Sequence, residues 1–303
     1  MTAELLIPLV LVIPLSWGII SLLLRSRWNP RFAVLGIMIQ AAAVIALSVA
    51  IYQQGSQSYT LAGWDIPLGI ELIASGLSVT LLALTALIAL ICAVYALFYL
   101  RSYPQQQAYF WPLFWFLLTS LNGIWLAGDL FNLYVGLELL TLAAVGLVTL
   151  NTDKTALEAG LRYLYFALFG SLLYLLGVAL LYGGYGTLAL SLLPELLETN
   201  LLTVLALVFI TLGLLMKTAV FPFHFWLPPA HGCALAPVSA LLSALVVKAS
   251  FYMIAVIWLT AYEALALSLL WTPQLLGVLG ASAIAYGSWR AFTTTHIKML
   301  VAW

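Results

Sequence analysis

The segment Leu77–Leu100, LSVTLLALTALIALICAVYALFYL, contains no charged residue. A helix needs about 20 mostly apolar residues to cross a hydrocarbon core that is about 30 Å thick. Strands that span a membrane alternate apolar and polar residues, and neither this segment nor Leu201–Met216 alternates in that way. The pattern therefore predicts transmembrane helices and argues against a membrane-spanning barrel.

The composition of the whole chain agrees with this prediction. Of its 303 residues, 65% are hydrophobic and 7% are charged, and the mean hydropathy is +1.15. Soluble domains contain about 45–50% apolar and about 25% charged residues. A chain with so few charged groups could not cover a water-facing surface. We therefore expect an all-α, polytopic membrane helix bundle.

Further segments on both sides of Leu77–Leu100 are long enough to span the membrane, and turn-forming residues separate them. We expect about nine to ten transmembrane helices. The predicted spans are Leu5–Leu24, Phe32–Tyr52, Leu72–Leu100, Phe110–Ala127, Leu130–Leu150, Tyr163–Leu181, Leu201–Pro222, Ala234–Thr260 and Ala264–Tyr286, and a tenth begins at Ile297.

The charged residues between these spans separate by sign. Loops on one side carry Arg25, Arg27, Arg31, Arg101, Lys154, Arg162, Arg290 and Lys298. Loops on the other side carry Asp65, Glu71, Asp129, Glu195, Glu198 and Glu263. Because Lys and Arg accumulate in cytoplasmic loops, we expect the N-terminus outside the cell, in a bacterial cytoplasmic membrane. Glu4 at the start of the first span argues against a cleaved signal peptide.

The sequence offers no pattern for a cofactor. Cys92 and Cys233 lie in apolar surroundings and are too few for an iron–sulfur ligand set, so we interpret them as buried packing residues. Gly-rich phosphate loops, dinucleotide fingerprints and HExxH zinc pairs are absent from the sequence. We therefore expect no cofactor, no metal and no nucleic-acid partner, and no redox or hydrolytic site in this chain.

Three charged residues fall inside predicted spans: Glu138, Lys217 and Lys248. A charged residue at the centre of a membrane helix costs about 2.5–3.5 kcal/mol even on the most lenient scale. One interpretation is a buried ion pair that only fixes how two helices pack, which would leave one lysine without a partner. The other is a polar, hydrated path, because ionisable residues inside membranes mark ion and proton routes.

The seventh span runs from Lys217 into an aromatic segment that contains Pro222. Proline lacks the backbone N–H and should interrupt the helix there. His224 follows Lys217 by seven positions, so an unbroken helix would place both on one face. Histidine titrates near neutral pH and suits a proton relay, although a packing role is the alternative. For His231, closer to the aqueous end, the packing role is the stronger interpretation.

These residue types allow a simple proton-transfer switch. Burial in a medium of low dielectric constant favours the neutral form of a lysine, and a nearby carboxylate favours the charged form. If Glu138 approaches Lys217, the lysine keeps its proton. If the carboxylate withdraws, or if Lys248 becomes charged, Lys217 should release it.

Several motifs resemble one family. They are Asp129-Leu130-Phe131-Asn132-Leu133-Tyr134 before Glu138, Lys217-Thr218-Ala219 followed by Phe221-Pro222 and His224-Phe225-Trp226-Leu227-Pro228, Ala236-Pro237-Val238-Ser239-Ala240-Leu241-Leu242-Ser243 before Lys248, and Ile297-Lys298-Met299-Leu300-Val301-Ala302. In order and spacing they resemble the antiporter-like, proton-pumping membrane subunits of respiratory NADH:quinone oxidoreductase (complex I) and of Mrp-type multisubunit cation/proton antiporters.

The resemblance implies roles for these positions. Glu138 and Lys217 would form a regulatory pair, Lys248 would be the next lysine of the proton path, and the seventh helix would be broken. His224 is a further candidate, with His231 and Lys298 as secondary ones. The resemblance also implies a unit of three helices at 1–108, a five-helix channel repeat at 109–262, and the start of a second repeat at 263–303.

The chain departs from the family at Ser75 and Pro229, where relatives often have Asp. Relatives also continue into a second, inverted half with another broken helix. The resemblance implies a proton-translocating subunit that contacts lipid and other membrane subunits of a complex, with exchange of Na⁺ for protons as the alternative. A non-conducting scaffold is a third possibility, but it would not require both buried lysines.

Overall fold

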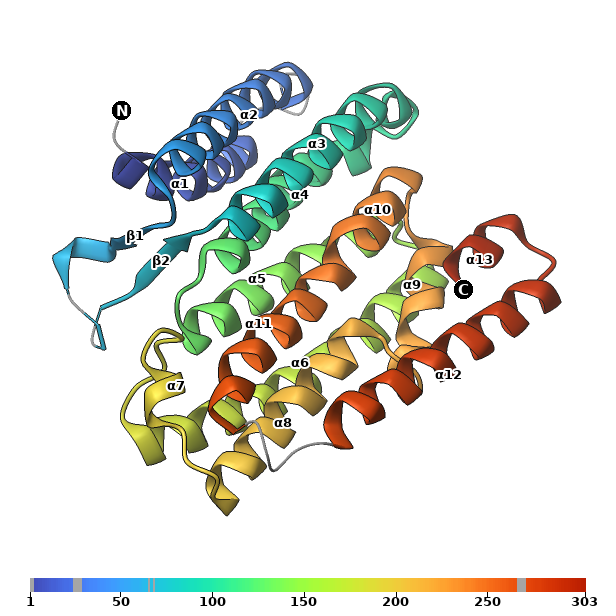
Figure 1. Cartoon of the computed structure of the whole chain (residues 1–303). Helices are drawn as coiled ribbons and strands as arrows, with labels where there is room; N and C mark the ends of the chain where they lie inside the picture. The colour runs from blue at the N-terminus through green and yellow to red at the C-terminus, as the bar shows by residue number, and fades with distance from the viewer. Residues whose placement is uncertain (1–2, 24–28, 65, 68, 266–270) are drawn as a thin grey trace.

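The computed structural model describes residues 3–23, 29–64, 66–67, 69–265 and 271–303. Within these residues the chain is almost entirely helical, as predicted (Figure 1). The helices are α1 (Ala3–Leu23), α2 (Asn29–Gln54), α3 (Gly76–Tyr99), α4 (Pro104–Leu126), α5 (Leu130–Val148), α6 (Lys154–Tyr185), α7 (Leu193–Leu196), α8 (Leu201–Thr218), α9 (Leu227–Cys233), α10 (Ala236–Leu241), α11 (Val247–Leu265), α12 (Trp271–Thr293) and α13 (Ile297–Ala302).

In the described part of the chain, 7 helical segments are long and apolar enough to cross a membrane. The predicted spans Phe110–Ala127 and Ala264–Tyr286 correspond to α4 and α12, which are not among them. Tryptophan, proline and amide side chains lower the hydropathy of α4, although its length of 23 residues corresponds to about 35 Å. The predicted ninth span began too early, because Ala264 and Leu265 still belong to α11.

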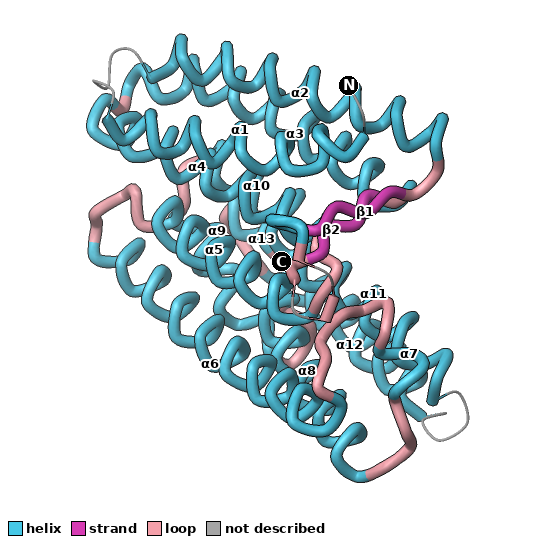
Figure 2. Tube along the Cα trace, turned by 90° about the vertical axis from the view of Figure 1, so that its left-hand side faces the viewer, coloured by secondary structure: helices cyan, strands magenta, loops and turns pink. Residues whose placement is uncertain are grey.

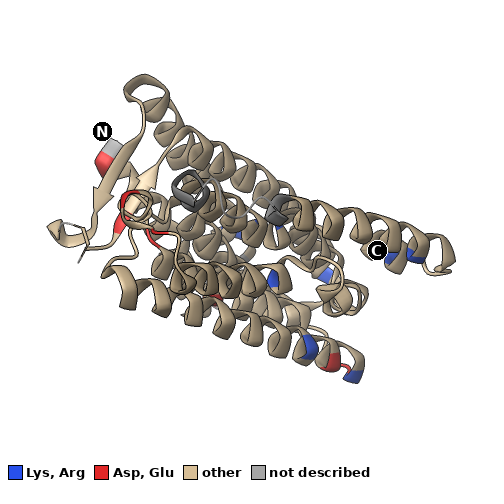
Figure 3. Ribbon diagram, turned by 60° about the horizontal axis from the view of Figure 1, so that its bottom comes forward, with Lys and Arg blue, Asp and Glu red and all other residues tan. Residues whose placement is uncertain are grey.

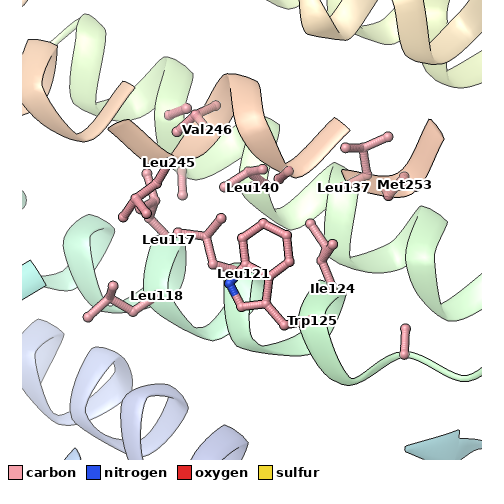
Figure 4. Close-up of a cluster of buried hydrophobic side chains, with 14 of the residues drawn as sticks. Leu117, Leu118, Leu121, Ile124, Trp125, Leu137, Leu140, Leu245, Val246 and Met253 are labelled. Atoms are coloured by element: carbon pink, nitrogen blue, oxygen red, sulfur yellow. The ribbon is translucent and has the colours of Figure 1, made fainter. Parts of the chain in front are cut away.

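Helix α4 forms the centre of the bundle and packs against α1 on one side and α5 on the other (Figure 1). The rings of Phe110, Trp111, Phe114 and Trp115 on this helix are inaccessible to solvent, so they pack inside the bundle and do not form an interfacial aromatic belt. A cluster of apolar side chains joins α4 to α5, α11 and the segment before α11 (Figure 4): Leu117, Leu121, Ile124, Trp125, Leu137, Leu140, Leu245, Val246 and Met253.

A short antiparallel hairpin interrupts the helices and was not predicted (Figure 2). Its strands are β1 (Gln57–Thr60) and β2 (Glu71–Ala74), and Thr60 pairs with Glu71. The prediction that a helix begins at Leu72 is therefore wrong, and α3 begins at Gly76. Leu72 and Ala74 are buried while their neighbours are partly exposed, which is the alternation of a strand that is covered on one face.

Most charged residues lie toward the two ends of the bundle (Figure 3). The end that carries the hairpin is acidic and includes Glu71, Asp129, Glu195 and Glu198. The opposite end is mostly basic, since Arg101 follows α3, Lys154 and Arg162 lie in the first part of α6 and Arg290 lies in the last turn of α12; Asp153 and Glu158 also lie there, at the start of α6. This agrees with the predicted separation by sign for the described residues. Arg25, Arg27 and Asp65 lie outside them, and the side chain of Glu263 is not described.

The predicted break in the seventh span is present. Helix α8 ends at Thr218, a 3₁₀ turn follows at Phe223–Trp226, and α9 continues to Cys233. Ala219 adopts a left-handed conformation (φ 55°) and ends the helix. In a continuous helix the carbonyl of Thr218 would accept a hydrogen bond from the N–H of residue 222. Pro222 has no N–H, so the helix stops four residues before the proline.

Candidate functional site

Lys217 lies in the last turn of α8, beside the break. The last carbonyl groups of a helix carry partial negative charge, which favours a cation at this position. One of these carbonyls, that of Met216, accepts a hydrogen bond from the indole N–H of Trp226 at 3.0 Å. The break therefore provides a partner for this backbone group and leaves the Lys217 side chain to reach across to α5.

Glu138 lies in the middle of α5, whose first turn is capped by Asp129. The Asp129 carboxylate accepts a hydrogen bond from the backbone N–H of Asn132 at 2.7 Å. A side-chain cap of this kind fixes where a helix begins. Because Glu138 lies at a set distance along α5 from this start, the cap also fixes where along the bundle the Glu138 side chain lies.

The structure joins the two residues. Lys217 Nζ lies 3.0 Å from Glu138 Oε1, and the side chains are 5% and 21% exposed. Lys217 Nζ also donates to Thr141 Oγ1 at 3.0 Å. The Thr141 hydroxyl donates to the carbonyl of Leu137 at 2.8 Å, so its oxygen is free to accept from the lysine. The predicted pair is thus a hydrogen-bonded ion pair with a neutral second acceptor for the ammonium.

Ser171 on α6 completes the cluster. Its hydroxyl is within hydrogen-bonding distance of Glu138 Oε1 and of the Ala167 carbonyl. A hydroxyl has one proton, so it can donate to only one of these acceptors at a time. Three helices, α5, α6 and α8, therefore converge on one carboxylate, and the carboxylate receives an ammonium and a hydroxyl.

Two glycines allow α8 to approach α6 closely enough for this contact. A Cβ atom on Gly213 would lie 2.3 Å from the carbonyl oxygen of Gly170, and a Cβ atom on Gly170 would lie 2.8 Å from that of Gly213. Small residues at such crossings are typical of helices that pack inside membranes. The crossing lies one turn before Lys217 and immediately before Ser171.

Lys248 is not part of this cluster. It follows a π-helical segment at Leu242–Val246, is exposed in the described structure, and its Nζ donates to the carbonyl of Ser243. Among the described residues no ion pair or hydrogen bond links it to Glu138 or Lys217. A π segment leaves carbonyl groups without their usual helical partners, and it has no recognisable sequence signal.

His231 and Lys298, the secondary candidates, line a common cavity of about 520 Å³. His231 is buried, and Lys298 Nζ donates to the carbonyl of Ala234. Serine residues from α10 and the π segment line the same space. The lining residues are His231, Ala236, Ser239, Ala240, Ser243, Ile297, Lys298, Val301 and Ala302. Ser243 connects this cavity to Lys248, because it is the residue whose carbonyl the lysine contacts.

His224 does not share a face with Lys217, because the helix ends between them. Its ring packs against Tyr286 at 4.9 Å and against Trp303 at 5.6 Å, beside a separate cavity of about 130 Å³. His224 Nδ1 is buried and has no hydrogen-bond partner among the described residues. The structure therefore separates His224 from the Glu138–Lys217 pair.

At the acidic end, Glu71 and Asp129 line a cavity of about 180 Å³. Burial raises the pKa of Asp129, and the nearby charge of Glu71 adds to this effect, although hydrogen bonds from Asn132 and Phe131 oppose it. Cys92 is buried and Cys233 is partly buried, and both are free thiols. The described residues contain no group of three or more His, Cys, Asp or Glu side chains arranged to hold a metal.

Comparison with known proteins identifies the family of this chain. Residues 127–303 match the family described as NADH:quinone oxidoreductase/Mrp antiporter, transmembrane. The chain is 36% identical over 312 aligned positions to the NADH-quinone oxidoreductase subunit N of Desulforudis audaxviator, covering 100% of this chain and 62% of that protein. It is 35% identical over 227 positions to a Na⁺/H⁺ antiporter subunit of Alkalihalophilus pseudofirmus, covering 74% and 45%.

A solved structure shares the fold. A chain of the Mrp complex from a Dietzia species superposes with a TM-score of 0.88 at 25% identity, over 100% of this chain and 56% of that chain. The present chain thus spans about half to two-thirds of the length of the relatives it matches. Because the family match covers more than half of the residues and includes Glu138, Lys217 and Lys248, the chain belongs to the NADH:quinone oxidoreductase/Mrp antiporter transmembrane family.

Proposed function

We propose that this chain belongs to a proton-translocating membrane subunit of a multisubunit complex, and that Glu138 and Lys217 control the proton transfer. The observation that carries the proposal is the contact of 3.0 Å between Lys217 Nζ and Glu138 Oε1 among apolar helices. Ionisable residues at such a depth are costly and mark ion or proton paths.

The contacts around Lys217 suggest how the pair works. While Glu138 is charged and close, the lysine ammonium is stabilised and keeps its proton. When Glu138 is neutralised or moves away, the oxygen of Thr141 is the one side-chain partner that the ammonium keeps among the described residues. A buried ammonium without a counter-charge favours losing its proton. The Ser171 hydroxyl can adjust to either state of Glu138. It can donate to the charged carboxylate, or it can donate to the Ala167 carbonyl when the carboxylate is neutral or has moved away.

Lys248 is the proposed next proton acceptor after Lys217. It contacts the carbonyl of Ser243, and Ser243 lines the cavity that also contains His231 and Lys298. This cavity is large enough to hold several water molecules, since a water occupies about 30 Å³ in the liquid. Hydrated side chains along it would carry protons between Lys248 and the basic end of the bundle.

The remaining assignments belong to the same proposal. Residues 1–108 would form a unit of three helices, 109–262 the five-helix channel repeat, and 263–303 the start of a second repeat. The N-terminus would lie outside and the basic end in the cytoplasm of a bacterium. The sign of the charges at the two ends of the bundle supports this orientation.

A second candidate is exchange of a monovalent cation for protons. The relative from Alkalihalophilus pseudofirmus, named as part of a Na⁺/H⁺ antiporter, favours it. The two candidates differ in the driving ion. Proton movement that requires Na⁺ on the opposite side of the membrane would favour exchange, and proton movement that is independent of Na⁺ would favour a pump.

The proposal is tested by proton uptake into sealed vesicles that contain the native complex, with Lys217→Ala and Glu138→Gln compared with the wild type. Loss of uptake in both variants, with the complex still assembled, is the expected result. Unchanged uptake in an assembled complex would mean that the pair is structural, and a scaffold would then be the better account.

A further inference from the structure

A small cavity lies among α2, α3 and α4, in a part of the bundle that the proposed proton path does not use. Polar side chains from three different helices line it. The lining residues are Ile37, Gln40, Thr85, Ala86, Ala89, Trp115, Leu118 and Asn122. Gln40 is 5% exposed and Trp115 is inaccessible to solvent, so this polarity is internal.

A proline in α1 explains how the Gln40 side chain is oriented. Pro14 lies inside α1 and lacks the N–H that the carbonyl of Val10 would otherwise accept. Gln40 Nε2 donates to this carbonyl at 3.2 Å, and Asn122 Nδ2 donates to it at 3.1 Å. Because a carbonyl can only accept, the amide nitrogen of Gln40 must face Val10. Its oxygen must therefore point elsewhere.

Two polar atoms at this cavity have no partner. Gln40 Oε1, an acceptor, and Trp115 Nε1, a donor, are both buried and form no hydrogen bond with the described residues. A buried polar group without a hydrogen bond costs about 1–3 kcal/mol, and native proteins rarely contain such a group. Here a donor and an acceptor without partners belong to residues that line the same space.

We propose that this cavity binds a water molecule that bridges Trp115 and Gln40. The space open to the centre of a water-sized sphere is about 10 Å³, which is close to the minimum for one water. The water accepts from the indole N–H of Trp115 and donates one proton to Gln40 Oε1. Thr85 Oγ1, which accepts from Trp125 Nε1 at 3.0 Å and belongs to a lining residue, is the acceptor for the second proton.

The bridge would join α2, α3 and α4 at the point where Pro14 weakens α1. Inside a membrane there is no bulk water to replace it, so its removal leaves the polar groups without partners. The site is independent of the Glu138–Lys217 pair and does not depend on the proposed function.

A matched pair of substitutions tests the bridge. Trp111 lies one turn before Trp115 on α4, is equally inaccessible, and its Nε1 also has no partner among the described residues, but it does not line the cavity. Trp115→Phe and Trp111→Phe remove the same atoms. We expect Trp115→Phe to lower the Tm of the purified complex by at least about 2 °C more than Trp111→Phe. Equal shifts would overturn the proposal.

If the variants fail to assemble, the water molecule can instead be observed directly in the wild-type complex. A high-resolution map of the wild-type complex should show density in the cavity within about 3.2 Å of both Trp115 Nε1 and Gln40 Oε1. A cavity without density, or one filled by a protein side chain, would overturn the proposal.

Discussion

Lys217 Nζ on α8 lies 3.0 Å from Glu138 Oε1 on α5, and also 3.0 Å from the hydroxyl oxygen of Thr141 on α5. The lysine therefore has a charged and a neutral acceptor at the same distance. The ammonium donates separate protons to two acceptors of different strength, and only one of these acceptors can change its charge. This asymmetry makes the pair suitable as a switch.

Neutralising one member of the pair should destabilise the protein more than neutralising both. Glu138→Gln leaves a buried ammonium, and Lys217→Met leaves a buried carboxylate. Either should cost about 3–5 kcal/mol, whereas the double variant should regain most of this loss. Thermal unfolding of the four proteins in detergent measures the effect. Additive losses in the double variant would show that the two charges do not stabilise each other.

Thr141→Val should slow proton transfer about tenfold, because it removes the neutral acceptor of Lys217 and keeps the shape of the side chain. Hydrogen bonds to charged groups contribute about 1.5–3 kcal/mol. Thr119→Val is the control, since Thr119 is also buried and also donates to the carbonyl four residues before it, at 2.9 Å. Rates of proton uptake that fall equally in both variants would contradict this role for Thr141.

Gly213→Ala should push α8 away from α6. The new Cβ atom would lie 2.3 Å from the carbonyl oxygen of Gly170, so the backbone must move. We expect a loss of roughly 1–3 kcal/mol in stability and slower proton uptake. Gly183→Ala on α6 is the control, because no atom of the described residues lies within 4 Å of its new Cβ. A Gly213→Ala protein as stable as this control would argue against the close crossing.

Asp129 should make stability depend on pH in a defined direction. Burial raises its pKa, so the folded protein holds this proton to higher pH than the unfolded chain does. The stabilisation is complete below the unfolded pKa of about 3.9 and is lost as the pH rises through the folded pKa. Asp129→Asn should therefore flatten the fall in Tm above about pH 4. A steeper fall in the variant would contradict the raised pKa.

Much of the site could be predicted from the sequence because charges inside apolar segments are conspicuous. Glu138 and Lys217 stand out in this way, and Pro222 correctly predicted the broken helix. Thr141 could have been found, since it follows Glu138 by three positions and shares its helix face. Ser171 could not, because it lies on α6 and its contact depends on how α6 crosses α8.

The fold was predictable for similar reasons and with similar limits. Long apolar runs locate the helices, whereas the hairpin was hidden because β2 continues almost directly into the apolar run of α3. The π segment at Leu242–Val246 lies just before Lys248, and nothing in its residues distinguishes it from an α-helix. His224 would share a face with Lys217 only on an unbroken helix, and after the predicted break its ring packs against Tyr286 and Trp303 instead.

The most direct test of the central claim is proton uptake by vesicles that contain the double variant Glu138→Gln/Lys217→Met. This variant removes both charges, so it should assemble and remain stable without an unpaired buried charge. If the pair controls proton transfer, uptake should fall to the level of vesicles without the complex. Uptake at the wild-type rate in a stable, assembled complex would contradict the account, because the pair would then serve only as a structural link between α5 and α8.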